Sequence, residues 1–121
     1  MFPRGFKITS RSDYQICYSR GRRFLARNFI VFVLPVAGQH WRLGIAASRK
    51  TGNAVKRNRI KRLVREVFRV NQHEIGLEAD IVVVVKRAAP IPELNYYLVR
   101  DELLPLLDRI TARIGRNGFN K

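Results

Sequence analysis

An uninterrupted run of five aliphatic side chains, Ile-Val-Val-Val-Val at residues 81–85, limits the folds open to this sequence. β-Branched residues favour strands, and an apolar run without alternation is typical of a strand covered on both faces. We therefore expect residues 79–86 to form a central strand of a sheet. A chain of 121 residues is long enough for one hydrophobic core, so we predict a single domain over residues 1–121.

Three further strands and three helices are predicted around that strand. Ser10 and Gly21 are typical start and stop residues of a helix over about residues 11–20. β-Branched, aromatic and alternating apolar residues then predict strands at about residues 22–27, 28–34 and 41–47. Apolar residues at helical spacing predict a last helical region over about residues 93–114, which Pro105 is expected to kink or divide.

The remaining predicted helix lies between the other two in sequence, over residues 54–70, with Asn53 as its N-cap. It has two contrasting faces. Its apolar stripe, which we expect to pack on the sheet, consists of Ile60, Leu63, Val64, Val67 and Phe68. The opposite half is almost entirely cationic, because residues 56–69 hold seven basic residues and one acid. A face that served only stability would mix charges of both signs. We interpret it as a binding surface rather than as an ordinary solvated helix face.

The excess of positive charge lies entirely in one part of the domain. The basic part, residues 1–70, contains 17 basic and 2 acidic side chains. The neutral part, residues 71–121, contains 7 of each, so the chain carries a net charge of +15. Arginine supplies 18 of the 24 basic residues, and its planar guanidinium binds phosphate through paired hydrogen bonds and stacks on bases. This composition favours a nucleic-acid partner over a membrane surface.

No segment of the sequence is typical of a membrane span or of a secretory signal. The longest apolar stretch, residues 29–38, is interrupted by Pro35 and is well short of the roughly 20 residues that cross a bilayer. Arg4 and Lys7 are not followed by the apolar region of a signal peptide. Cys17 is the only cysteine, so no internal disulfide can form. We expect a cytoplasmic protein that does not bind membranes.

The catalytic groups of a self-sufficient nuclease are not evident. Such an enzyme needs clustered carboxylates for metal ions or a histidine pair for acid–base chemistry. His73, Glu74, Glu78 and Asp80 could be drawn as a metal site, but we interpret them as the solvated exit from the cationic helix. Cys17 is interpreted as a small buried hydrophobic residue. We therefore assign no catalytic residue and no metal ligand to this chain.

Residues 50–66, Lys-Thr-Gly-Asn-Ala-Val-Lys-Arg-Asn-Arg-Ile-Lys-Arg-Leu-Val-Arg-Glu, resemble the signature of the protein subunit of bacterial ribonuclease P. The Arg-Asn-Arg core at 57–59 is the most specific part of it. Upstream, Tyr14, Tyr18, Gly21 and Phe32 fit the aromatic helix, glycine and aromatic strand of that family, and residues 43–50 resemble the strand that leads into the signature. The resemblance runs from about residue 6 to about residue 112.

This resemblance implies an α+β helix-sheet sandwich of order αβββαβα, with a left-handed strand-helix-strand crossover through the Arg-rich helix. It also implies a non-catalytic subunit of an endoribonuclease. The partners would be a catalytic RNA, which uses Mg²⁺ to remove the 5′ leader from precursor tRNA, and the leader itself. The alternative is a small structural RNA-binding protein, such as a ribosomal protein, which would share the charge but not the signature.

The same resemblance implies an RNA-binding surface on the cationic helix. On the helix itself it consists of Arg57, Asn58, Arg59, Lys61, Arg62, Arg65 and Arg69, and beside it of Arg49, Lys50 and Lys56. On a helical wheel, Arg57, Lys61 and Arg65 share one edge and Arg59 lies on the other. Our hypothesis is that the first edge borders the leader and that the second meets the catalytic RNA.

A groove for the leader would be lined by Tyr14, Tyr18, Phe32 and Arg11. Aromatic walls with a cationic rim suit a single strand, whose unstacked bases and phosphates need both. Apart from the resemblance, these aromatic residues suit packing against the sheet equally well. A tyrosine hydroxyl fits a half-exposed site better than a dry core.

Overall fold

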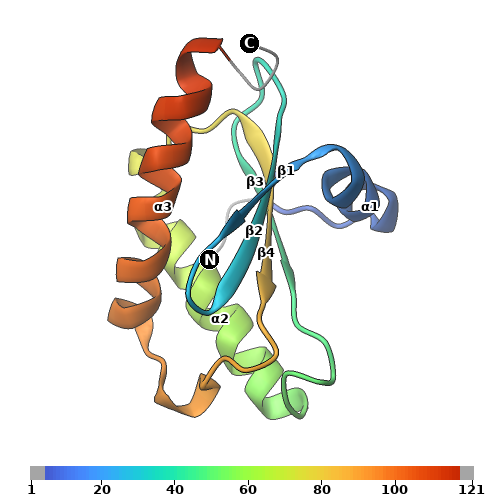
Figure 1. Ribbon diagram of the computed structural model, residues 1–121, viewed down its shortest axis with the longest axis vertical. Coiled ribbons are helices and arrows are strands. Elements are labelled where there is room, and N and C mark those ends of the chain that lie inside the picture. The colour runs from blue at the N-terminus through green and yellow to red at the C-terminus, as the bar shows by residue number, and fades with distance from the viewer. Residues whose placement is uncertain (1–4, 118–121) are drawn as a thin grey trace.

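The computed structural model of the protein describes residues 5–117, and a four-stranded sheet is its centre (Figure 1). The strands are β1 (Arg22–Leu25), β2 (Phe29–Pro35), β3 (Arg42–Ala46) and β4 (Ala79–Val85), in the spatial order β1-β2-β4-β3. The strand pairs β1–β2 and β2–β4 are antiparallel, and β3–β4 is parallel. The prediction that the apolar run forms a central strand is confirmed, because β4 lies between β2 and β3.

Helices cover both faces of the sheet. In Figure 1, α1 (Arg11–Arg20) lies on one face, and α2 (Ala54–Val70) and α3 (Tyr96–Asn117) lie on the other. Two short 3-10 helices, η1 (Gln72–Glu74) and η2 (Ile91–Glu93), connect the larger elements. The predicted order αβββαβα is confirmed. The helix α2 joins the parallel strands β3 and β4, and the left hand of that crossover stays a prediction.

Side-chain caps set the start of the first two helices. Ser10 Oγ accepts a hydrogen bond from the amide of Asp13 at 3.2 Å, and Asn53 Oδ1 accepts one from the amide of Lys56 at 3.0 Å. Each bond satisfies one of the amides that the first turn of a helix leaves without a partner. The predicted bounds of both helices are confirmed, and these caps explain where each helix begins.

The two faces of the sheet differ in how completely they are covered. On β2, the side chains of Phe29, Val31 and Val33 are fully buried beneath α2 and α3, whereas the alternating Phe32 and Leu34 face α1 and are half-buried. A strand points successive side chains to opposite faces, so one strand serves two environments. The main core therefore lies between the sheet and the pair α2 and α3.

Pro105 does not divide the last helix. The helix α3 continues through it without interruption, so of the two predicted outcomes the division into two helices is wrong, and the kink stays a prediction. Proline removes the hydrogen bond to the carbonyl four residues earlier, here that of Asp101. Both residues lie on the exposed side of α3, where water can bond that carbonyl. The helix tolerates the missing bond because the free carbonyl of Asp101 faces solvent.

The outer edge of β3 is covered by the N-terminal segment, residues 6–8. The amide of Leu43 donates to the carbonyl of Phe6 at 2.8 Å, and the amide of Ile8 donates to the carbonyl of Leu43 at 2.9 Å. Lys7 thereby pairs with Leu43 in a parallel bridge. This contact was not predicted from the sequence, and it brings Lys7 beside the cationic helix.

Candidate nucleic-acid interface

Three aromatic side chains form a continuous row between α1 and the sheet. The ring centroids of Tyr14 and Tyr18 are 6.4 Å apart, and those of Tyr18 and Phe32 are 5.0 Å apart in an edge-to-face arrangement. Tyr18 is 38% exposed, and Tyr14 and Phe32 are half-buried. The structure thus brings together the three predicted groove aromatics. Tyr18 is not a core residue, whereas Tyr14 and Phe32 contribute to the packing beneath α1 as well.

The strand β3 fixes the position of the Tyr14 ring. The Tyr14 hydroxyl oxygen accepts a hydrogen bond from the amide of Ile45 at 3.1 Å. The ring lies directly over Gly44, where an added Cβ would come within 2.7 Å of a ring carbon. Only glycine allows so close an approach of ring and backbone. One side of the ring is therefore held by the strand.

Cys17 anchors α1 to the same face of the sheet. Its side chain is fully buried, and its thiol donates weak hydrogen bonds to the carbonyls of Phe32 at 3.6 Å and Asp80 at 3.7 Å. Burial, together with the nearby charge of Asp80, raises the pKa of Cys17 to about 11. The prediction of a buried Cys17 is confirmed, and its thiol stays protonated at neutral pH.

An ion-pair network holds the start of α1 against β3 and β4. Arg42 donates two hydrogen bonds to the carboxylate of Asp80, at 2.8 and 2.7 Å, and one to Asp13 of α1 at 3.4 Å. Gln39 donates a further bond to Asp80 at 2.7 Å. Burial alone would raise the pKa of Asp80, but the hydrogen bonds from Arg42 and Gln39 outweigh it and hold that pKa below its usual value.

The amphipathic helix α2 packs as its sequence predicts. Its apolar stripe faces the sheet and α3, with Leu63 half-buried and the rest fully buried: Ile60, Val64, Val67 and Phe68. On the outer side, Lys56, Asn58, Arg59, Arg62 and Arg65 are exposed, and Arg57, Lys61 and Arg69 are half-buried. The flanking Arg49 and Lys50 are exposed in the loop before α2. The cations thus form one continuous surface along the helix.

Three of the predicted RNA-binding arginines have partners within the chain. Arg57 donates to the carbonyl of Gly52 at 3.0 Å, and Arg59 donates to the carbonyl of Leu94 at 2.7 Å. Arg69 forms an ion pair with Glu66, and its hydrogen bond lowers the pKa of that carboxyl. A carbonyl leaves the charge of an arginine unneutralised, so Arg57 and Arg59 can still attract phosphate. Within residues 5–117, Lys61, Arg62 and Arg65 have no hydrogen-bond or ion-pair partner.

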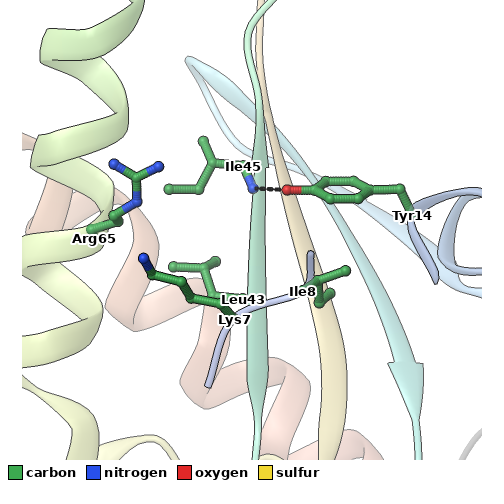
Figure 2. A pocket seen from close by; sticks show the side chains of 6 residues that line it. All are labelled: Lys7, Ile8, Tyr14, Leu43, Ile45 and Arg65. Carbon is green, nitrogen blue, oxygen red and sulfur yellow. Dashed lines mark hydrogen bonds between the residues drawn. The ribbon is translucent and has the colours of Figure 1, made fainter. Parts of the chain in front are cut away.

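The two edges of the cationic face point toward different parts of the molecule. Arg65 lines a small pocket at the edge of β3 together with Tyr14 and Lys7 (Figure 2). Arg59 instead reaches the loop before α3 through the carbonyl of Leu94. Arg11, exposed at the start of α1, shares a helix face with Tyr14 and Tyr18. Tyr14 of the aromatic row and Arg65 of α2 therefore meet at the edge of β3, whereas Arg59 reaches a different part of the molecule.

Lys7 is a cation of this surface that sequence reasoning did not select. It stands in the short alternating segment Phe-Lys-Ile-Thr at residues 6–9. Four residues are too few to predict a paired segment, and nothing in them indicates β3 as the partner. Only the folded chain shows that Lys7 and Arg65 lie beside one pocket.

The acidic and histidine residues after α2 do not converge. Asp80 belongs to β4 and is bound by Arg42 and Gln39, while Glu78 accepts a hydrogen bond from the amide of Gly38 at 3.1 Å. Across the described part of the chain, no three His, Cys, Asp or Glu side chains are grouped so that they could hold a metal ion. None of the helices in residues 5–117 is both long and apolar enough to cross a membrane.

Comparison with known proteins identifies the family. Residues 2–111 match the family model described as Ribonuclease P. The ribonuclease P protein component of Desulfovibrio desulfuricans is 47% identical over 116 residues, which cover 94% of this chain and 89% of that protein.

Solved structures agree with this match. The RNase P protein of Staphylococcus aureus aligns with a TM-score of 0.76 and 33% identity, over 88% of this chain and 96% of that chain. The RNase P protein from Thermotoga maritima aligns with a TM-score of 0.77 and 33% identity, over 85% and 96% of the two chains. The predicted α+β fold is confirmed. This chain therefore belongs to the ribonuclease P protein family and is the protein component of an endoribonuclease ribonucleoprotein of tRNA processing.

Proposed function

We propose that this protein binds the single-stranded 5′ leader of precursor tRNA on one side and the catalytic RNA subunit on the other. The observation that carries this proposal is the row of Tyr14, Tyr18 and Phe32 ending beside the cationic face of α2. Stacking on such rings contributes roughly 1–3 kcal/mol per base and tolerates any sequence. A leader has no fixed sequence, so this mode of binding suits it.

The cations of α2 supply the contacts to phosphate. Single strands are held by a cationic path for the backbone beside a stacking surface for the bases. Lys61, Arg62 and Arg65 can offer all their donors to RNA, because none is engaged within the described chain. The edge with Arg65 would meet the leader, and the edge with Arg59 would meet the catalytic RNA.

The protein would position substrate rather than perform the chemistry. Mg²⁺ held by the RNA subunit would supply the activated water and stabilise the leaving oxygen. The protein would raise the affinity of the complex for precursor over mature tRNA, since only the precursor carries a leader. This role places the protein in the cytoplasm, with its RNA.

Reconstitution with a bacterial ribonuclease P RNA tests the proposal. The protein with that RNA should cut precursor tRNA once, at the mature 5′ end, and should bind precursor more tightly than mature tRNA. Protein that is rigorously free of RNA should leave the precursor intact at every Mg²⁺ concentration. Cleavage by the protein alone, or equal affinity for the two tRNAs, would contradict the proposal.

Footprinting tests the assignment of the two edges of α2. In the complete complex, Arg65→Ala should expose leader nucleotides, and Arg59→Ala should expose nucleotides of the catalytic RNA. Both arginines belong to one helix, so each variant is the control for the other. If both variants expose the same RNA segment, the two-edge assignment is wrong.

A further inference from the structure

A small basic pocket at the edge of β3 lies between the aromatic row and the cationic face of α2, the two surfaces that we propose bind the leader. Its volume is about 50 Å³, and its lining residues are Lys7, Ile8, Tyr14, Leu43, Ile45 and Arg65. A single water needs roughly 10–15 Å³ of such space, so the pocket can admit a larger polar group. Figure 2 shows Lys7 and Arg65 on the α2 side of β3 and Tyr14 on the other side.

The polar side chains of this pocket are all hydrogen-bond donors. Lys7 offers an ammonium group, and Arg65 offers a guanidinium that no other group of the described chain engages. The oxygen of the Tyr14 hydroxyl already accepts from the amide of Ile45, so the hydroxyl proton is free to be donated outward. No carboxylate is among the lining residues. This set of groups suits an anion with several acceptor oxygens.

The main chain of Lys7 is fixed against β3 by its two neighbours in sequence. The residues on either side of it, Phe6 and Ile8, are both hydrogen-bonded to Leu43 of β3. The side chain of Ile8 is buried on the α1 side with Cys17 and Val82, whereas that of Lys7 is exposed. In Figure 2, Lys7 extends from this segment toward α2 and Arg65. An anion here would therefore meet a lysine whose main chain is already ordered, which lowers the entropy cost of binding.

We propose that Lys7, Arg65 and the Tyr14 hydroxyl bind one backbone phosphate of the leader as the strand crosses the edge of β3. This inference rests on the proposed function, because it concerns the same substrate. Tyr14 belongs both to the aromatic row and to the pocket, so the pocket connects the stacking surface to α2. One phosphate bound at a fixed place would set the register of the leader relative to the cleavage site.

Leader length provides the test, in the complete complex of protein and RNA subunit. A phosphate reaches the pocket only when the leader is long enough, so the affinity of the normal protein should rise in a step at one leader length. Lys7→Ala should weaken the binding of precursors longer than that length about tenfold. It should not change the binding of shorter precursors or of mature tRNA. Lys7→Arg should restore the step. Arg113→Ala, which removes an exposed cation from α3, should leave it unchanged.

A chemical change in the substrate makes the test specific for one phosphate. We replace the phosphate at the step length by an uncharged methylphosphonate. For the normal protein this should lower the affinity about tenfold, the same loss as Lys7→Ala causes. For Lys7→Ala the replacement should cause little further loss, because the contact is already absent. The inference is wrong if Lys7→Ala loses the same affinity at every leader length. It is also wrong if Lys7→Ala loses no affinity while the normal complex still prefers precursor to mature tRNA. If the normal complex shows no such preference, the proposed function fails, and this inference fails with it.

Discussion

The two faces of the sheet are built from the same strands but have different tasks. Beneath α2 and α3, Val31 of β2 and Val83 of β4 are fully buried. On the other face, Phe32 and Val84, which follow them directly in sequence, are only half-buried, because the ten-residue helix α1 covers a part of that face. The first face is a closed core. The second is the face that we propose binds the leader, and its inner residues pack beneath α1.

If the α1 face binds the leader as proposed, this difference is how a small domain places a binding site on a sheet. Alternation along a strand lets one residue stabilise the fold while its neighbour remains available to a ligand. The open face still needs anchors, and Cys17 and the pair of Arg42 with Asp80 provide them at the end where α1 lies. The aromatic row is therefore exposed at its outer side and rigid at its base.

The largest expected effect distinguishes the closed face of the sheet, beneath α2 and α3, from the open face, which α1 covers only in part. Phe68 of α2 is fully buried in the closed core, so Phe68→Ala should lower the free energy of unfolding by about 3–5 kcal/mol. Phe32→Ala should cost less than half of that, because the Phe32 side chain keeps part of its surface in water. Urea unfolding of both variants measures the difference. Equal losses would mean that the α1 face is as much a core as the other.

The ion pair beneath α1 should be the strongest stabilising contact of the open face. The Asp80 side chain is 8% exposed and that of Arg42 is 26% exposed. Asp80→Asn should destabilise the fold by about 3 kcal/mol, at the low end for a broken buried pair, since Arg42 is partly solvated. Urea unfolding at neutral pH measures this loss, and Asp101→Asn on the exposed side of α3 is a matched control.

The same pair predicts how stability depends on pH. The pKa of Asp80 in the folded protein is lower than in the unfolded chain, where it is about 3.9. Its contribution to stability is therefore complete above pH 4 or so, and it is lost as the pH falls through the folded pKa. Unfolding curves of the normal protein should weaken over that range more steeply than those of Asp80→Asn. Parallel pH curves would show that the pair contributes little.

The sequence was sufficient for the parts of the fold that local rules determine. Ser10 and Asn53 are N-caps with the expected bonds, so both helix starts are predicted correctly. The unbroken apolar run at residues 81–85 predicts a central strand, and in β4 all of its residues are buried except the half-buried Val84. Among the site residues, the spacing of Tyr14 and Tyr18 along α1 predicts that they share a helix face.

The parts that the sequence did not predict depend on distant contacts. The N-terminal segment pairs with β3 across more than thirty residues, so the place of Lys7 is invisible in the sequence. The bond from Arg59 to the carbonyl of Leu94 likewise joins α2 to a loop whose position only the fold defines. The sequence could not show that α3 continues through Pro105, because a helix tolerates proline when the freed carbonyl faces water, and exposure is a property of the folded chain.

Tyr18 tests whether the open face binds leader. Its side chain is 38% exposed, so Tyr18→Ala should weaken precursor binding by about 1–3 kcal/mol through lost stacking. Binding of mature tRNA, which lacks the leader, should not change. Tyr18→Phe keeps the ring and should bind as the normal protein does. Affinities for both tRNAs, measured beside the urea midpoint, distinguish stacking on the leader from a role in stability. Equal losses for the two tRNAs with a lowered midpoint would mean that Tyr18 stabilises the fold and does not bind leader.

The smallest expected effect concerns the outer side of α2, the helix that closes the other face. Arg62 is exposed and unengaged within the described chain, so it can displace a condensed cation from the catalytic RNA. Arg62→Ala should lower the slope of log affinity for that RNA against log salt concentration by about 1. Arg59→Ala should lower the slope by a similar amount and also reduce thermal stability slightly, because the Leu94 carbonyl loses its donor. Titrations at several salt concentrations measure both slopes. An unchanged slope for Arg62→Ala would mean that Arg62 belongs to the solvated surface and contacts no phosphate, so that α2 would contribute to the fold at this turn and not to RNA binding.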